Sequence, residues 1–364
     1  MNDRRRARRA KQARRNGRRA KKRTTESSAD WTLRDAIRSV LGGHPLGLLS
    51  MACVMVDAAI PERVLEMFDG VRTREMTALL AVTAELLVDE PATQLECRRE
   101  VAERNEHLPR WIAALPRADA YRAVRITDAY RDFDQLVIGM RIGQHELTVV
   151  VTLDHLLWSR ITDTEAVHEP IGEVLAHVIE SRTDIDVFEM TLADARAWIA
   201  DVLDKSTFAP KSETWPLYKP LVRWALDRLP DGGEHRPPVT DWESNEELCD
   251  KFFATSSAAP FTESEHRELL HEFFETGSVD PLRWSPARVH QAIGDTPYRE
   301  HSMPLEVALD APDLLRAYIP YAHAQCGIRD ELTSRTLARV DALRLRYKRL
   351  LLREYEDEYL DDAV

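Results

Sequence analysis

Paired cysteines are missing from this sequence. Its four cysteines, Cys53, Cys97, Cys249 and Cys326, lie far apart, and no two of them form a CxxC motif. This spacing argues against a disulfide framework and against a structural zinc site. Because unpaired cysteines suit a reducing compartment, we expect a cytoplasmic protein.

Long apolar runs are missing as well. The longest run of apolar or small residues is LGLLSMACVMV at 46–56, whereas a helix needs roughly 20 apolar residues to cross a bilayer. The run therefore predicts a buried helix, and no membrane partner is expected.

Recognisable catalytic and cofactor motifs are also absent. The chain contains no G-x-S-x-G, P-loop, G-x-G-x-x-G or H-E-x-x-H motif. We therefore expect no cofactor and no metal, and the sequence identifies no catalytic residue. This absence favours a non-enzymatic protein over an enzyme.

Charge is abundant but unevenly distributed. The 364 residues include 50 Lys and Arg and 62 Asp and Glu, a net charge of −12. Residues 1–23 hold 13 of the basic residues and one acid, which leaves 37 basic and 61 acidic residues, or −24, on the remainder. A cationic arm thus precedes an anionic body. Because acidic surface repels a phosphate backbone, nucleic acid would have to bind the arm or a local basic patch.

The basic arm has the composition of a disordered segment. It has no aromatic residue, and alanine is its largest aliphatic residue after Met1, so it cannot bury enough surface to offset chain entropy. We predict that it binds RNA, DNA or another polyanion, since neutralising phosphates releases counterions. The predicted contacts are Arg4, Arg5, Arg6, Arg8, Arg9, Arg14, Arg15, Arg18, Arg19, Lys21, Lys22 and Arg23. The alternative is a solubilising tail that contacts only the protein's own acidic surface.

A second basic feature lies on the last predicted helix, which runs from Arg329 to about Glu356. At 100° per residue, five arginines form one stripe beside an apolar face. They are Arg335, Arg339, Arg346, Arg349 and Arg353. The stripe is a secondary candidate for phosphate contact, although arginines near a helix C-terminus more often complement the helix dipole.

Apolar periodicity predicts an α+β protein with a predominantly helical body and one short antiparallel β-meander. The period changes from 3.6 to 2 in QLVIGMRI at 135–142 and ELTVVVTLDH at 146–155, and Gly143 between them suits a hairpin. Segments 121–127 and 158–162 are predicted to flank this hairpin. Since only one face is strongly apolar, helices are expected on that face alone.

These patterns divide the chain into five parts. We expect a disordered basic arm at 1–28, a helical N-terminal unit at 29–116, the β-meander followed by helices at 117–230, a C-terminal helical unit at 240–356 and an acidic tail at 357–364. Capping boxes at 244–247 and 262–265 are predicted to start two helices of the C-terminal unit.

Two sets of histidines are weaker candidates for sites. Asp154 and His155 form the most enzyme-like pair, but strand alternation sends their side chains to opposite faces. Two E-x-x-H pairs end at His266 and His271, and their histidines diverge on one helix. We therefore expect His266 to pack on Phe261 and not to bind a metal.

Aromatic residues between 215 and 224 form the last candidate surface. Trp215, Tyr218 and Trp224 alternate with prolines and an arginine, a composition found on base-stacking surfaces. Core packing is the favoured interpretation, because aromatic side chains contribute chiefly through buried area.

Several stretches resemble a family of uncharacterised actinobacterial proteins. The resemblance is carried by HPLGLLSMA at 44–52, TALLAVTAELL at 77–87, LPRWIAAL at 108–115, HELTVVVTLDH at 145–155, ETWPLYKPLVRWALDRLP at 213–230, DPLRWSPARV at 280–289 and APDLLRAYIPYAH at 311–323. It implies one co-folded body and a cytoplasmic bacterial setting. It implies no activity, ligand or catalytic residue.

The favoured function is a non-enzymatic cytoplasmic protein whose basic arm contacts nucleic acid or another polyanion. The first alternative is a protein-interaction scaffold, with a partner on the helical body and an incidental arm. The second is a hydrolase-like enzyme with Asp154, His155 or His168 in a cleft beside the meander.

Overall fold

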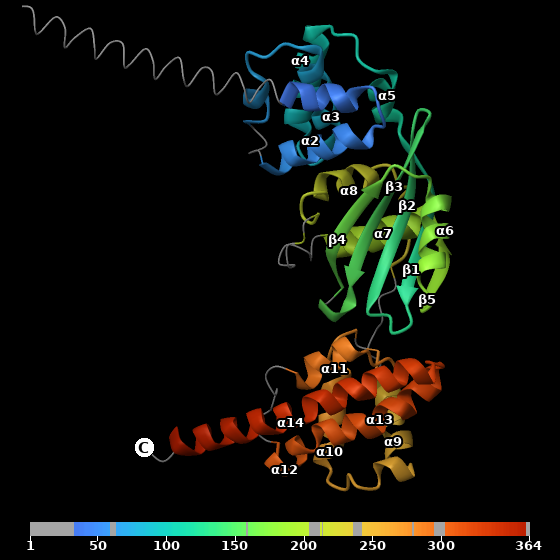
Figure 1. Cartoon of the computed structure of the whole chain (residues 1–364), viewed down its shortest axis with the longest axis vertical. Helices are drawn as coiled ribbons and strands as arrows, with labels where there is room; N and C mark the ends of the chain where they lie inside the picture. Colours follow the sequence, from blue (N-terminus) through green and yellow to red (C-terminus); the bar gives the residue numbers. More distant parts are fainter. Residues whose placement is uncertain are drawn as a thin grey trace, which may run out of the picture.

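The computed structural model describes residues 33–58, 63–157, 159–203, 212, 214–235, 242–278, 280–294 and 303–361. The predicted arm at 1–28 and the last residues of the acidic tail, 362–364, lie outside this part of the chain. Figure 1 shows three tiers along the longest axis: N-terminal helices, a β-sheet with its own helices, and C-terminal helices. The predicted α+β class with one antiparallel sheet is confirmed.

The first tier consists of the helices that precede the sheet. They are a helix over 33–41, α2 (Leu46–Ala58), α3 (Arg74–Leu86), α4 (Pro91–Arg104) and α5 (Arg110–Ala114), with 3-10 turns η2 (Leu65–Phe68) and η3 (Leu115–Arg117). The apolar run at 46–56 forms most of α2 and packs against α3, as a buried helix should. No helix in the described residues is both long and apolar enough to cross a membrane.

Five antiparallel strands form the middle tier in the order β4-β3-β2-β1-β5. The first four form the predicted meander: β1 (Asp119–Asp128), β2 (Phe133–Ile142), β3 (His145–Asp154) and β4 (Arg160–Val167). Gly143 begins the two-residue turn between β2 and β3 with a φ of +61°, which glycine adopts without a steric penalty. β5 (Ile185–Met190) pairs with β1. It was not predicted, because its four central residues are exposed and the segment therefore has no alternating apolar face.

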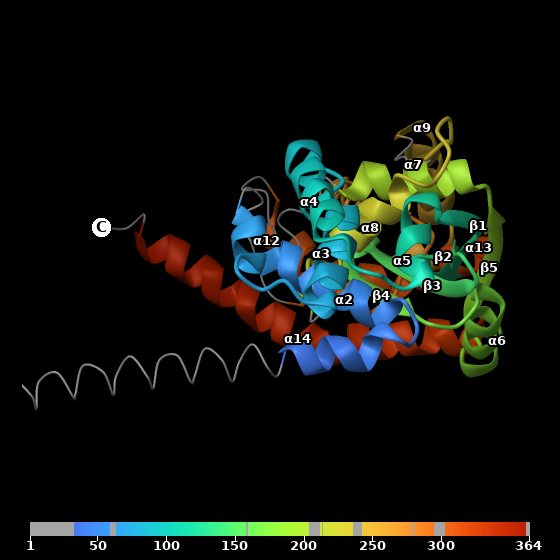
Figure 2. The same cartoon turned by 90° about the horizontal axis from the view of Figure 1, so that it is seen from above.

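Helices cover both faces of the sheet, so the prediction of one covered face is wrong. α7 (Leu192–Leu203) and α8 (Lys219–Leu226) share a large core with the N-terminal helices and with the Leu136 to Leu153 face of the hairpin. α6 (Ile171–Ser181) covers the opposite face (Figure 2), where valines of β1, β2 and β3 form a smaller apolar surface. These valines are enough to bury one side of a single amphipathic helix.

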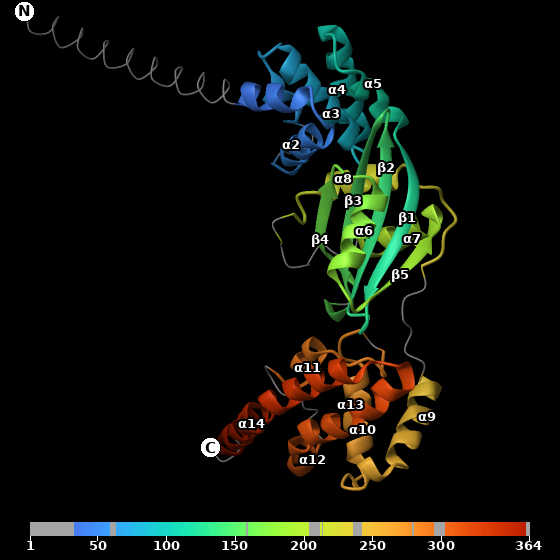
Figure 3. The same cartoon turned by 45° about the vertical axis from the view of Figure 1, so that its right-hand side comes forward.

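The third tier is a helical unit with a core of its own. Its helices are α9 (Trp242–Phe253), α10 (Glu265–Phe274), α11 (Pro286–Ile293), α12 (Leu305–Leu309), α13 (Ala311–Cys326) and α14 (Asp330–Asp361). Ser244 lies inside α9, and Ser264 instead of Thr262 precedes α10, so neither capping box starts its helix as predicted. α14 is longer than predicted, and its C-terminal end extends beyond the rest of this tier (Figure 3).

The tip of the β1–β2 hairpin connects the sheet to the C-terminal helices. The Tyr130 hydroxyl donates to the Leu332 carbonyl at 3.0 Å, and Arg283 donates to the Ala129 carbonyl at 2.6 Å. Asp132 is buried in this contact beside Ser285, the N-cap residue of α11. The hairpin tip is therefore held between two separate cores.

Candidate functional site

The arginine stripe of α14 is the part of the predicted phosphate-binding surface that the structure describes; the arm residues lie outside it. Four stripe arginines are exposed and Arg339 is half-buried. The neighbouring apolar face is buried through Leu332, Val340, Leu343, Tyr347 and Leu351. This burial fixes the rotation of α14, so the arginines line a side of the helix that faces solvent.

Ion pairs near α14 leave most of this stripe unneutralised. Arg344 and Lys348, which lie on another side of the helix, both bind Asp313, at 2.8 and 2.9 Å. Asp341, the one acid between residues 335 and 353, pairs with Arg316. Within the described stretches, no ion pair engages Arg335, Arg339, Arg349 or Arg353. The stripe spans about 27 Å at 1.5 Å of rise per residue.

A chain of hydrogen bonds joins three side chains at the end of the sheet nearest the C-terminal helices. Asp134 lies on β2, His155 begins the 3-10 turn η4 (His155–Leu157) after β3, and Ser159 directly precedes β4. Asp134 Oδ2 is 3.0 Å from His155 Nε2, and His155 Nδ1 is 2.8 Å from Ser159 Oγ. Asp134 and His155 are buried, whereas Ser159 is half-buried.

The ionisation of Asp134 determines which ring nitrogen of His155 carries a proton. Burial is the largest single effect and opposes ionisation of its carboxyl group. The hydrogen bond and charge of His155, the Thr127 hydroxyl and Arg125 together outweigh burial and hold the pKa of Asp134 below its usual value. Arg125, 3.8 Å away, acts in the same direction. Because an ionised carboxylate only accepts hydrogen bonds, His155 Nε2 carries the ring proton. In the neutral ring, Nδ1 is then the acceptor for the Ser159 hydroxyl.

The residues predicted for a hydrolase site do not converge. Asp154 accepts a hydrogen bond from the Leu156 backbone N–H at 2.9 Å, while His155 bonds to Asp134 and Ser159. His168 lies at the other end of the β3–β4 ladder, exposed beside Glu169.

Asp134 was not predicted from the sequence as the partner of His155. The signal was the hairpin register: pairing of Ile142 with His145 also pairs Asp134 with Leu153. Because alternate residues of a strand share a face, His155 then lies on the same face as Asp134, two positions along.

The histidines of the described chain do not form a metal site. No group of three or more His, Cys, Asp or Glu residues in that part of the molecule is placed to hold a metal ion. The His44 ring lies 5.5 Å from that of His145, but both His44 nitrogens already bond to backbone, at Leu46 and Glu146. Burial is the main cause of the lowered pKa of His44, which favours its neutral form. His266 packs on Phe261 as predicted, with ring centroids 5.4 Å apart.

The aromatic segment at 215–224 belongs to the core, as the favoured interpretation predicted. Trp215 and Trp224 are 3% and 0% exposed, and the Tyr218 hydroxyl lies 3.0 Å from that of Ser50. These rings are therefore not presented to bases or to a peptide.

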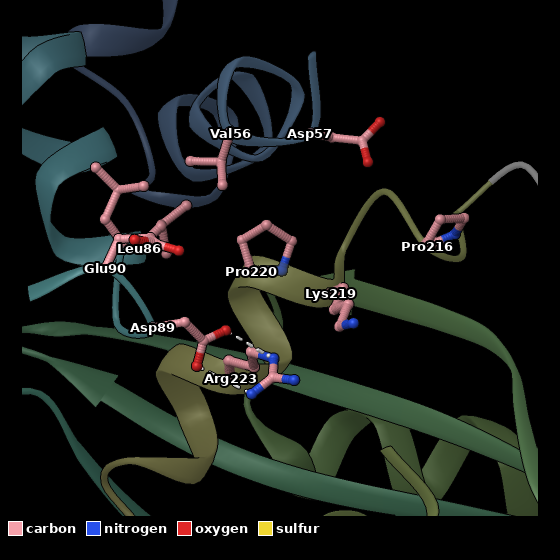
Figure 4. A pocket seen from close by; sticks show the side chains of 10 residues that line it. Val56, Asp57, Leu86, Asp89, Glu90, Pro216, Lys219, Pro220 and Arg223 are labelled. Carbon is pink, nitrogen blue, oxygen red and sulfur yellow. Dashed lines mark hydrogen bonds and ion pairs between the residues drawn. The ribbon is translucent and has the colours of Figure 1, made fainter. Parts of the chain in front are cut away.

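A pocket of about 320 Å³ lies between α2, the end of α3 and α8 (Figure 4). Arg223 and Asp89 face each other across one side of it, with both nitrogen–oxygen distances at 2.9 Å. Asp57 and Lys219 extend from α2 and α8 at its other side. Since acids and bases are mixed and one pair is already formed, the pocket does not favour an anionic ligand.

Comparison with known proteins assigns no role to these residues. The sites must therefore be interpreted from the chemistry of this chain alone. No protein-family model matches the chain, and no curated protein or solved structure matches it significantly.

Proposed function

We propose that this is a cytoplasmic protein that binds the phosphate backbone of RNA or DNA through the arginine stripe of α14 together with the basic arm. The observation that carries the proposal is the arginine stripe, in which Arg335, Arg349 and Arg353 are exposed and form no ion pair with any described residue. Arginine is suited to phosphate because its planar fork of N–H donors binds two oxygens at once.

Local charge explains how an acidic protein would bind a polyanion. The net charge of −12 repels phosphate at long range, but salt screens such repulsion beyond about 8–10 Å. Between Arg335 and Arg353 the one acid of α14 is Asp341, which is engaged by Arg316. Along α14, a phosphate backbone lying on the stripe would therefore meet five arginines and one acid that is already paired.

The cytoplasmic setting is supported by the cysteines. All four are free thiols in the structure, and Cys53, Cys97 and Cys249 are buried. Unpaired cysteines are typical of reducing compartments such as the cytoplasm. Membership of the actinobacterial family stays a prediction and adds no argument about a ligand.

Replacing the five stripe arginines with glutamine is expected to weaken binding to a generic duplex DNA or single-stranded RNA by at least about tenfold at moderate salt. The slope of log K against log salt should fall by about 3 to 5, since each lost phosphate contact removes close to one unit. Fluorescence anisotropy across a salt series, with full-length protein, measures both quantities. Deletion of residues 1–23 should reduce the slope further.

A matched control separates the stripe from net charge. Five exposed arginines elsewhere are replaced by glutamine, which changes the charge of the protein by the same amount: Arg63, Arg74, Arg99, Arg110 and Arg117. This control should bind like the wild type. If the stripe variant and the control bind equally well, the stripe is not the binding surface; if the wild type binds neither nucleic acid, the proposal fails and a protein partner becomes the better hypothesis.

A further inference from the structure

The hydrogen-bonded chain of Asp134, His155 and Ser159 orders a carboxylate, an imidazole and a hydroxyl. These are the groups and the order used by serine hydrolases, in which histidine removes the proton of serine and a carboxylate orients the histidine. Both distances, 3.0 and 2.8 Å, are within hydrogen-bond range. A neutral ring suits this chemistry, because Nε2 then donates to the ionised Asp134 while Nδ1 accepts the Ser159 hydroxyl.

Burial differs among the three hydrogen-bonded residues in the way that serine-hydrolase chemistry requires. Asp134 and His155 are each 5% exposed at their side chains, so water does not compete for their hydrogen bond. Ser159 is half-buried, so it is the most accessible residue of the three. The hydroxyl therefore belongs to the residue nearest solvent, and the charged acid is the protected one.

The backbone of Ser159 adds a second observation. Its φ is +54°, in the left-handed region that non-glycine residues seldom adopt. Two hydrogen bonds hold the neighbouring turn at Leu156. The Leu156 carbonyl accepts from the Gln291 side chain of α11, and the Leu156 backbone N–H donates to the Asp154 carboxylate. Such held, unfavourable conformations concentrate at functional positions.

We propose that Ser159 is the nucleophile of a hydrolytic site for small acyl esters, with His155 as general base and Asp134 as a positioning residue. Ser159 Oγ forms a bond to the carbonyl carbon while its proton passes to His155 Nδ1. The bond to the leaving oxygen then breaks, and His155 returns the proton to the departing alcohol. Water, deprotonated by His155, next attacks the acyl–Ser159 ester and releases the carboxylic acid with Ser159 restored.

This activity is independent of the arginine stripe. The stripe lies on α14, whereas Ser159 precedes β4 at the end of the sheet, so variants in one leave the groups of the other in place. Loss of nucleic-acid binding would not remove the esterase chemistry, and the reverse also holds.

A fluorophosphonate probe tests the nucleophile directly, because it modifies serines that a general base has activated. Full-length protein should be labelled at Ser159, located by peptide mass spectrometry, and should hydrolyse p-nitrophenyl acetate. Ser159→Ala should reduce both rates by on the order of 10²-fold or more, as loss of general-base chemistry does. Ser212→Ala is the matched control, since Ser212 Oγ donates to Asp163 at 3.0 Å with no histidine between them.

Asp134→Asn and Asp134→Glu together test the positioning role. In Asp134→Asn, labelling should slow by at least about tenfold, because the wrong ring nitrogen then carries the proton. Asp134→Glu keeps a carboxylate that accepts from the ring, so it should recover part of the labelling rate that Asp134→Asn loses. Wild-type labelling no faster than that of Ser159→Ala, or equal labelling of Ser212, would overturn the proposal.

Discussion

Replacing Arg288 with methionine is expected to lower the free energy of unfolding of the C-terminal helices by about 3–5 kcal/mol, the cost of breaking a buried charged network. Arg288 is fully buried on α11. Its guanidinium donates to four backbone carbonyls, those of Asp280, Arg283, Phe273 and Phe274. Burial lowers its pKa to about 10, so it remains charged at neutral pH.

The cost arises from the carbonyls that the variant leaves behind. Methionine matches the length of the stem but donates no hydrogen bond. The carbonyls of Phe273 and Asp280 still accept from the backbone N–H groups of Thr276 and Arg283. The loss therefore falls chiefly on the carbonyls of Arg283 and Phe274, since a buried carbonyl without a partner loses roughly 1–3 kcal/mol. The Trp284 ring, 4.2 Å from the guanidinium carbon, would also lose a cation–π contact. Together these groups connect the end of α10, the segment at 280–284 and the first turn of α11.

Arg267→Met provides the matched comparison for urea unfolding followed by circular dichroism. Arg267 also lies over an aromatic ring, that of Phe253 at 4.9 Å, and pairs with Asp250, but its side chain is 42% exposed. Its loss should cost less than about 1 kcal/mol, as for most exposed pairs. If Arg288→Met unfolds at the same urea concentration as Arg267→Met, the four carbonyl contacts do not stabilise the fold as argued.

The sequence predicted the parts of the fold that depend on local periodicity. The alternation of Leu136 to Ile142 and of Leu147 to Leu153, with Gly143 between them, predicted the hairpin, but its register was not predicted. β5 was not predictable in the same way, because an edge strand with four exposed residues lacks that alternation. Helices were predicted after the meander, but the place of α6 on the second face depended on valines that form a smaller apolar set.

The candidate sites also differ in whether they follow from local periodicity or from long-range contacts. The stripe of α14 follows from helical geometry alone, so its five arginines could be chosen from the sequence. The chain from Asp134 to Ser159 depends on a strand pairing and on the turn after β3, which place residues 21 positions apart in contact. Arg288 gave no signal at all, because its partners are carbonyls of neighbouring segments, which any sequence contains.

Asp132→Asn is expected to stabilise the protein at pH 8 by up to about 4 kcal/mol, since each unit of pKa shift corresponds to 1.36 kcal/mol. Burial of Asp132 raises its pKa from 3.8 to about 7. Asp128 and Asp154 act in the same direction, whereas the Ser285 hydroxyl and Arg288 of α11 oppose it. One oxygen of its carboxyl group, Oδ1, has no hydrogen-bond partner in the described structure.

The sign follows from proton binding. The folded protein holds the Asp132 proton more tightly than the unfolded chain, so the wild type loses stability as pH rises from about 4 to about 7 and then levels off. Asparagine is uncharged and keeps the hydrogen-bonding capacity toward Ser285. The difference in unfolding free energy between variant and wild type should therefore be small at pH 4 and largest above pH 7, which urea unfolding at a series of pH values measures.

Asp134→Asn should show the opposite behaviour, although it lies only two residues away. The lowered pKa of Asp134, held by His155 against burial, gives stability that is present above the unfolded pKa and is lost as pH falls through the folded one. Removing the Asp134 carboxylate should therefore destabilise the protein at neutral pH and matter less in acid.

The Asp132 prediction is contradicted if the difference in unfolding free energy between Asp132→Asn and the wild type is the same at pH 4 and pH 8. That result would show that the Asp132 carboxyl group ionises in the folded protein as freely as in the unfolded chain. The contact between the hairpin tip and α11 would then have to contain water around Asp132, because only solvation removes the penalty of burying that charge.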